Sequence, residues 1–147
     1  MKTITRLETT EELIALKALV SSAHLPVSDI TQSSLQTFFG IRDGADLVAT
    51  IGLEVYGQDA LLRSLAVLPS HRKQGLAHAL LRHAETHAAQ QRVTSLYLLT
   101  TNAQDFFSGH GYMRLTRESA PAPITASVQF SGLCPASSAF LHKSIAH

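Results

Sequence analysis

The sequence predicts an α/β (α+β) fold in which one sheet carries helices on both faces. Three features of the 147-residue chain support this prediction. The first half contains consecutive strand-like segments separated by short turns, which is typical of an antiparallel meander. The second half alternates apolar strand-like runs with helical patterns. The last segment again alternates apolar and polar residues, as a sheet with one buried face requires.

The first elements are a strand and a capped helix. A short strand is expected around Thr3 to Leu7. Thr9 and Glu12 then have the spacing of a capping box, in which the glutamate reaches back to the start of the helix. The helix behind them places four apolar residues on one face, namely Leu13, Leu16, Leu19 and Val20.

The meander follows this helix. Residues 38–42 and 47–56 flank the turn Asp43-Gly44, so they predict a hairpin. Residues 57–59 turn the chain again into 60–68, a mostly apolar run that is typical of a central strand and that Pro69 ends.

The second half begins with a helix from about Gly75 to Gln91. A buried strand is expected over 95–101 and a short helix over 102–109. A further strand starts near Tyr112, and the final strand spans 140–145. We expect residues 119–147 to complete the sheet and line the substrate site, because an antiparallel return would cover the edge of the preceding strand.

Composition narrows the class of protein. Hydrophobic residues make up 45% of the chain and charged residues 16%, which predicts a single globular domain over 1–147. A net charge of +1 does not favour a nucleic-acid partner. No stretch is apolar enough to suggest a membrane partner. The single cysteine excludes an intrachain disulfide, and we expect a cytoplasmic location.

The segment Arg72-Lys73-Gln74-Gly75-Leu76-Ala77 lies between the central strand and the following helix. A helix N-terminus has free N–H groups and the positive end of the helix dipole, so it favours a phosphate. Glycine lets the ligand approach the backbone, and the two cations suit a multiply anionic ligand. The segment lacks the endings of a P-loop and of a dinucleotide fingerprint. It therefore predicts a pyrophosphate site formed mainly by backbone groups.

This segment resembles the motif of the Gcn5-related N-acetyltransferase (GNAT) superfamily, in which Gln/Arg-x-x-Gly-x-Gly/Ala follows a strand ending in Val-x-Pro. Val67-Leu68-Pro69 supplies that strand end, and the run from Phe106 to Tyr112 resembles the superfamily's later marker. The resemblance covers about residues 3–117. It implies a mixed, mostly antiparallel twisted sheet with a splayed central strand pair. It also implies acetyl-CoA as cosubstrate and no metal.

By this resemblance, pantetheine lies where residues 65–67 splay away from 95–101, and an N–H of residues 65–67 polarises the thioester. Asn102 holds the pantetheine or its loop. Phe107 stands where many members have a tyrosine that protonates the departing thiolate, a task left to Tyr112, Ser108 or water. The predicted cofactor-binding residues are Leu65, Ala66, Val67, Arg72, Lys73, Gln74, Gly75, Leu76, Ala77, Asn102 and Phe107.

Glu54 is the predicted catalytic base, because it lies on a strand antiparallel to the cofactor strand and shares a face with Tyr56. A solvent-facing structural carboxylate is the alternative. Arg63 lies inside the most apolar strand and needs a partner there. It either binds a carboxylate of the substrate or pairs with Glu54.

The end of the chain carries a second, weaker resemblance. Residues 120–124, followed by 133–137, resemble a branch of arsenic-resistance N-acetyltransferases. That branch implies a small amino-acid-like amine, with an arsenic-bearing one among the options. Cys134 would line the acceptor site as a wall residue, a soft ligand or a nucleophile. His83 and His87 have metal-ligand spacing, but the sequence shows no third ligand nearby.

These features together predict direct transfer of an acetyl group from acetyl-CoA to a primary amine of a small amino-acid-like molecule. A screen of amines that follows the release of free coenzyme A would test this prediction best. The expected binding partner is then a small-molecule amine substrate. The sequence also allows a homodimer. The alternatives are a protein lysine or N-terminal acetyltransferase and a catalytically silent acyl-CoA-binding module.

Overall fold

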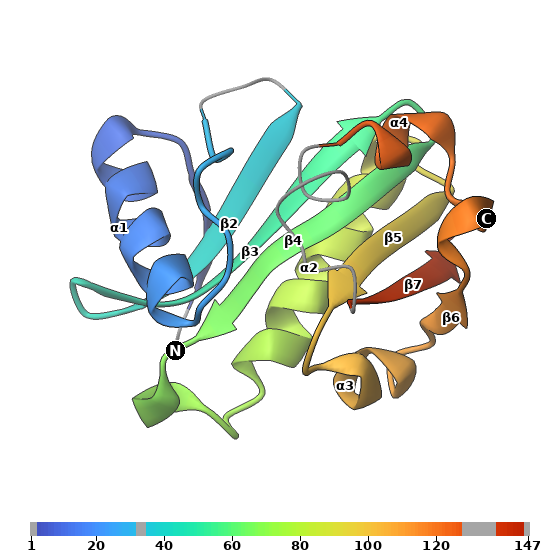
Figure 1. Ribbon diagram of the computed structural model, residues 1–147. Coiled ribbons are helices and arrows are strands. Elements are labelled where there is room, and N and C mark those ends of the chain that lie inside the picture. The colour runs from blue at the N-terminus through green and yellow to red at the C-terminus, as the bar shows by residue number, and fades with distance from the viewer. Residues whose placement is uncertain (1–2, 32–34, 128–137, 146–147) are drawn as a thin grey trace.

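The sheet has seven strands in the order β1-β2-β3-β4-β5-β7-β6. The computed structural model describes residues 3–31, 35–127 and 138–145. The strands are β1 (Ile4–Leu7), β2 (Gln36–Asp43), β3 (Asp46–Tyr56), β4 (Asp59–Val67), β5 (Ser95–Thr100), β6 (Met113–Leu115) and β7 (Ala139–Ser144). All neighbouring pairs are antiparallel except β4 and β5, which are parallel. This mixed, mostly antiparallel sheet confirms the predicted fold class (Figure 1).

Helices cover both faces of the sheet. They are α1 (Thr10–Ser22), α2 (Leu76–Gln90), α3 (Gln104–Ser108) and α4 (Ala122–Thr125), with 3₁₀ turns at Pro69–His71 and Arg117–Ser119. Phe38 and Phe39 of β2 show how the two faces differ. Successive side chains of a strand point to opposite faces, so Phe38 packs with α1 and Phe39 packs with α2.

The predicted apolar faces of both long helices are buried. Leu16 and Val20 of α1 are fully buried, and Leu80 and Ala84 of α2 are as well. The capping box is also present, because Thr9 accepts from the N–H of Glu12 and Glu12 accepts from the N–H of Thr9. Local sequence therefore determines where α1 begins.

The final strand, β7, lies inside the sheet and not at its edge. β7 pairs with β6, as predicted, but also with β5 along its whole length, from Ser95↔Ser144 to Thr100↔Ala139. β6 has only three residues and pairs over three positions. β7 has six residues, pairs with all six of β5, and lies between β5 and β6. Among the helices of the described residues, none is long and apolar enough to cross a membrane.

Candidate active site

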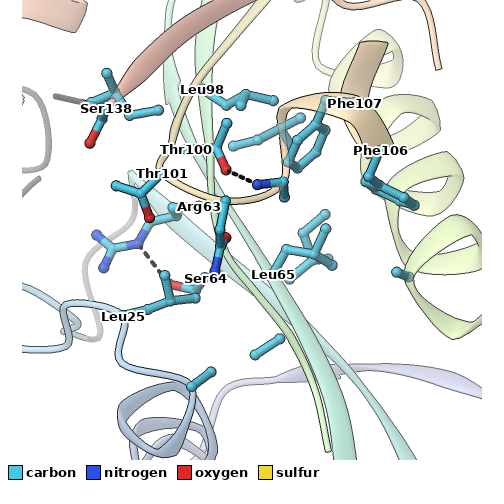
Figure 2. Close-up of a pocket in the computed structure, with 18 of the residues that line it drawn as sticks. Leu25, Arg63, Ser64, Leu65, Leu98, Thr100, Thr101, Phe106, Phe107 and Ser138 are labelled. Atoms are coloured by element: carbon cyan, nitrogen blue, oxygen red, sulfur yellow. Dashed lines mark hydrogen bonds between the residues drawn. The ribbon is translucent and has the colours of Figure 1, made fainter. Parts of the chain in front are cut away.

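A cavity of about 510 Å³ opens where β4 and β5 separate, and we call it the inter-strand cavity. The two strands pair only at Asp59↔Ser95, Ala60↔Leu96 and Leu61↔Tyr97. From residue 62 onward, the side of β4 that faces β5 has no strand partner among the described residues. Its N–H and C=O groups can therefore bind an amide-containing ligand as an added strand would. The cavity is lined by residues 23–26, 61–67, 98–103, Ile51, Arg72, Ala77, Phe106, Phe107 and Ser138 (Figure 2).

A β-bulge lies on the wall that β4 contributes. Gly52 pairs with Arg63 and Thr50 pairs with Ala66, so a single residue of β3 faces both Ser64 and Leu65. Ser64 has a φ of 56°, the left-handed region, which L residues other than glycine seldom adopt. The hydroxyl of Thr50 donates to the Ser64 carbonyl at 3.0 Å and holds this conformation. A bulge re-aims the backbone locally, so it turns the groups after Ser64 toward the cavity.

The predicted pyrophosphate cradle lies at the start of α2. Gly75 is the N-cap residue with a φ of 80°, and no side chain of the described residues caps this helix. In α1, by contrast, the capping box satisfies the equivalent N–H groups. The first N–H groups of a helix have no acceptor within the helix. A Cβ at Gly75 would meet no atom within 4 Å, so the backbone at this position is open to a ligand on that side.

The cradle contributes two residues to the cavity wall. Arg72 lines the inter-strand cavity and its Nε donates to the carbonyl of Val67 at 3.3 Å. This contact holds a cation at the mouth between strand and helix. Ala77 lines the cavity from the first turn of α2. Leu76 is different, because its side chain packs into the core and leaves only its backbone for a ligand.

A histidine pair fixes the cradle against α3. His110 Nδ1 lies 2.8 Å from the carbonyl of Phe106, so this nitrogen donates and Nε2 is the acceptor. His78 Nδ1 then donates to His110 Nε2 at 2.7 Å. His78 belongs to the first turn of α2 and Phe106 lines the cavity. The pair therefore links the first turn of α2 to the residue Phe106 of the cavity wall.

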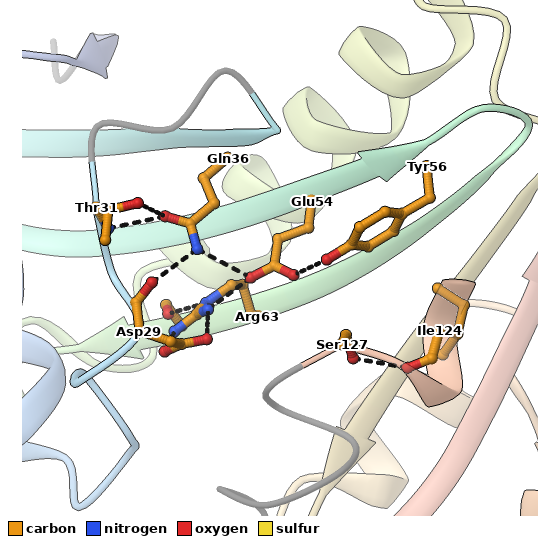
Figure 3. A network of polar contacts seen from close by, with 9 residues as sticks. Asp29, Thr31, Gln36, Glu54, Tyr56, Arg63, Ile124 and Ser127 are labelled. Atoms are coloured by element: carbon orange, nitrogen blue, oxygen red, sulfur yellow. Dashed lines mark hydrogen bonds and ion pairs between the residues drawn. The ribbon is translucent and has the colours of Figure 1, made fainter. Parts of the chain in front are cut away.

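Arg63 forms the centre of a buried ionic network (Figure 3). Its Nη2 donates to Asp29 Oδ1 at 2.7 Å, and its Nη1 donates to Glu54 Oε2 at 2.6 Å and to Asp29 Oδ2. Its Nε donates to Ser64 Oγ at 3.0 Å. Burial alone would lower the pKa of Arg63, but the hydrogen bonds to Asp29 and Glu54 outweigh it and raise that pKa. Four of the five N–H donors are thus engaged.

Glu54 accepts hydrogen bonds at both oxygens. The hydroxyl of Tyr56 donates to Oε1 at 2.5 Å, and the amide of Gln36 donates to Oε2 at 3.2 Å, beside the bond from Arg63. Burial and the bond to Glu54 raise the pKa of Tyr56, so this phenol stays protonated. A carboxylate has about four acceptor positions. Within the described residues, Oε1 keeps one position for an incoming donor.

Gly52 explains how Arg63 reaches its partners. A Cβ at this position would lie 2.6 Å from the ring of Phe38 and 3.0 Å from Cγ of Arg63. The missing side chain lets the arginine stem pass across the sheet, with its guanidinium 5.8 Å from the centre of the Phe38 ring. The network therefore depends on a glycine in the neighbouring strand as well as on its charged members.

A second pocket lies beside this network, and we call it the α4 pocket. Its volume is about 340 Å³. It is lined by Asp29, Thr31, Leu35, Gln36, Glu54, Tyr56, Pro123, Ala126 and Ser127. The short helix α4 is held over β4 and β5 because Ile124 packs with Leu61 and Tyr97. Described residues of the C-terminal segment thus form part of the wall that faces Glu54.

The structure places most predicted cofactor residues together. The residues that line the inter-strand cavity are Leu65, Ala66, Val67, Arg72, Ala77, Asn102 and Phe107. Those at the cradle that do not line it are Lys73, Gln74, Gly75 and Leu76. Glu54 lines the α4 pocket, and the alternative of a solvent-facing carboxylate is wrong because it is 3% exposed. Their roles in binding and catalysis stay predictions.

For Arg63, the structure shows the pair with Glu54 and adds Asp29 as a second partner. Cys134 lies outside the described residues. The predicted stand-ins for the tyrosine lie elsewhere: the hydroxyl of Tyr112 donates to Glu85 at 2.9 Å, and Ser108 is exposed at the end of α3. Neither residue lines the inter-strand cavity.

Sequence reasoning missed several members of the site. Asp29 lies in a loop 34 residues before Arg63, and only the demand of a buried arginine for anions pointed to such a residue. Gln36 is the first residue of β2, and no sequence motif marks it as a member of the site. Ser64 is a second polar residue in an apolar strand, which could have pointed to it, but composition does not reveal a bulge. Ser138 was also missed, although it lines the cavity and is buried.

The model of the acetyltransferase (GNAT) family matches residues 7–112. The chain belongs to this family of acetyl-CoA-dependent acetyltransferases. None of the curated proteins compared with the chain matches it significantly.

Solved structures share the fold at low sequence identity. The N-acetylglutamate synthase of Neisseria gonorrhoeae, complexed with coenzyme A and N-acetyl-glutamate, matches all of this chain with a TM-score of 0.82 and 16% identity. This chain spans only 36% of that protein. Tetrahymena Gcn5 gives a TM-score of 0.78 at 16% identity, with 97% of this chain and 96% of that one covered. The ribosomal-protein-S18-alanine N-acetyltransferase of Escherichia coli gives 0.73 at 18% identity, with 100% and 96% covered.

Proposed function

We propose that this protein transfers the acetyl group of acetyl-CoA directly to the primary amine of a small molecule. The observation that carries the proposal is that Arg63 connects the inter-strand cavity with the α4 pocket. Arg63 lines the inter-strand cavity, and both of its carboxylate partners line the α4 pocket. An acyl donor in the first space and an amine in the second would meet beside the bulge at Ser64.

The residues of the inter-strand cavity suit coenzyme A. The uncapped start of α2 would hold the pyrophosphate, with Arg72 as a nearby cation. The unpaired side of β4 would bind the amides of pantetheine. A backbone N–H of the bulge segment would stabilise the negative charge that develops on the thioester oxygen. These assignments use backbone groups, which explains why few side chains identify the site.

We propose that Glu54 accepts the proton that the attacking amine must lose. Oε1 retains an acceptor position on the side of Tyr56, which is enough for the amine or for one bridging water. Arg63, Gln36 and Tyr56 hold the carboxylate in place, so it needs no reorganisation during the reaction. The thioester carbon then loses coenzyme A without an acyl-enzyme intermediate.

Small amino-acid-like amines are the first acceptors to test, since the arsenic-resistance branch that the C-terminus resembles suggests them. The engagement of Arg63 limits how such a molecule would bind. One N–H of the guanidinium makes no hydrogen bond to a described residue, so a substrate carboxylate could accept from that group alone unless it displaced Asp29 or Glu54. The panel should therefore include matched amines with and without a carboxyl group.

The decisive experiment follows the release of free coenzyme A from acetyl-CoA with each amine, and identifies the product by mass spectrometry. We expect turnover with at least one small amine and no covalently acetylated protein in its absence. Turnover of peptides alone would indicate a protein acetyltransferase. Binding of acetyl-CoA with no turnover of any amine would indicate a silent binding module.

A further inference from the structure

Ser138 has a buried hydroxyl with no partner. The residue is 6% exposed and stands immediately before β7. Within the described part of the chain, its Oγ is the one buried side-chain polar atom that makes no hydrogen bond. A buried, unsatisfied polar group costs stability, so such a group in a folded protein needs an explanation. Alanine at this position would avoid that cost.

The position of Ser138 supplies the explanation. Ser138 lines the inter-strand cavity. Because Ala139 pairs with Thr100, the preceding residue Ser138 lies beside the end of β5 near Thr101. Figure 2 shows it at the end of the cavity that holds Arg63, away from Phe106 and Phe107. Arg117 fixes its backbone by donating to the Ser138 carbonyl at 3.2 Å. The hydroxyl thus stands on the wall opposite the bulge.

We propose that the hydroxyl of Ser138 donates a hydrogen bond to the sulfur of the departing coenzyme A thiolate. This inference rests on the proposed function. When the thioester oxygen points at the bulge of β4, the sulfur on the same trigonal carbon stays inside the inter-strand cavity, whose lining includes Ser138. Phe107, another residue of the cavity wall, has no hydroxyl. Ser138 fills that need from a different element of the fold.

The step balances without a covalent enzyme intermediate. The amine nitrogen forms a bond to the carbonyl carbon and gives its extra proton to Glu54 or water. The carbon–sulfur bond breaks, and its electron pair passes to sulfur. A serine hydroxyl is a much weaker acid than a thiol, so Ser138 keeps its proton and stabilises the thiolate. Water protonates the sulfur afterwards.

Thr101 is the competing hydroxyl, since it also lines the cavity. It is exposed, so water can satisfy it and its presence needs no further explanation. Thr100 accepts from the N–H of Ala103 at 3.0 Å and has a structural task. Burial without a partner therefore separates Ser138 from both neighbours.

The test measures the ionisation of the thiol in the complex with coenzyme A. Thiolate absorbance in the ultraviolet is titrated for the bound molecule, and the complex with desulfo-coenzyme A serves as the blank that removes tyrosine signals. We expect the pKa of the bound thiol to lie below the pKa of free coenzyme A titrated in the same way. In Ser138→Ala the pKa of the bound thiol should rise by about one to two pH units, because a hydrogen bond to a charged group changes an ionisation constant by a factor of about 10 to 100.

Activity and stability complete the test. Ser138→Ala should lower kcat by about 10- to 100-fold while its midpoint of thermal unfolding stays equal or rises, because an unsatisfied group has been removed. Ser138→Thr keeps the hydroxyl and should retain most of the effect on the thiol. Ser119→Ala is the matched control, since Ser119 is exposed and lines neither space.

Three results would overturn the inference. An unchanged thiol pKa in Ser138→Ala would show that the hydroxyl serves another atom, even if kcat falls. A lower unfolding midpoint with an unchanged thiol pKa would make it structural. A shift in Thr101→Val that is absent in Ser138→Ala would assign the role to Thr101. Failure of the wild type to bind coenzyme A would instead overturn the proposed function, and this inference with it.

Discussion

Gly75→Glu tests the cradle most directly. The glycine has a φ of 80°, and a Cβ there would meet no atom within 4 Å. The substitution therefore creates no clash in the free protein. Its cost to folding comes from the left-handed backbone alone, which is about 1–2 kcal/mol for an L residue. Gly75→Asn should cost less, because asparagine tolerates this region better.

The effect on binding follows from charge. Two unit charges about 5 Å apart interact by about 0.8 kcal/mol in water and by about 3 kcal/mol at an effective dielectric constant of 20. A pyrophosphate presents two negative charges to the new carboxylate, so the loss is about 2–6 kcal/mol. Since each 1.4 kcal/mol is a factor of ten, the affinity for coenzyme A should fall by at least about tenfold.

Calorimetric titration with coenzyme A measures this loss, and chemical unfolding confirms that the variant is folded. Gly57→Glu is the matched control. Gly57 has a φ of 68°, is equally open and lies in the turn at the other end of β4, so it adds the same strain and charge away from the cradle. Equal affinities for Gly75→Glu and Gly57→Glu in folded proteins would refute the assignment of the cradle.

Three further predictions concern side chains. Glu54→Gln should lower kcat/KM by about 100-fold or more and spare acetyl-CoA affinity, and unchanged turnover would leave Glu54 with a structural role. Arg63→Met should cost about 3–5 kcal/mol in chemical unfolding, because the buried carboxylates of Asp29 and Glu54 lose their cation; a cost under about 1 kcal/mol would contradict the network. Cys134→Ser should change turnover little, whereas a mass spectrum of the wild type with an acetyl-Cys134 that substrate removes would establish a nucleophile.

Local patterns in the sequence predicted the parts of the fold that depend on local physics. The capping box at Thr9 and Glu12 is read from four residues, and the hairpin at Asp43-Gly44 from its turn. The cradle is equally local, since a helix start with a glycine and no cap can be recognised in six residues. These features follow from backbone geometry and nearest neighbours, so a single sequence contains them.

The remaining parts of the site depend on contacts between distant segments. Nothing near Asp29 indicates that it pairs with Arg63, because loop length and direction decide that contact. β7 lies between β5 and β6, and the alternation of apolar and polar residues within one strand does not determine strand order. Ser138 attracts notice only because its buried hydroxyl makes no hydrogen bond to the described residues, and this can be seen only in the folded structure.

The bulge on β4 links the two halves of the proposed reaction. Neighbouring residues in a regular strand point to opposite faces, so their side chains cannot bond to each other. Arg63 Nε nevertheless donates to Ser64 Oγ at 3.0 Å, because the left-handed backbone at Ser64 brings both to one side. The same bond anchors the bulge to the ionic network around Glu54. We therefore expect a change in that network to move the backbone that we propose faces the thioester, and substitutions of Glu54 and Ser64 should be non-additive in kcat.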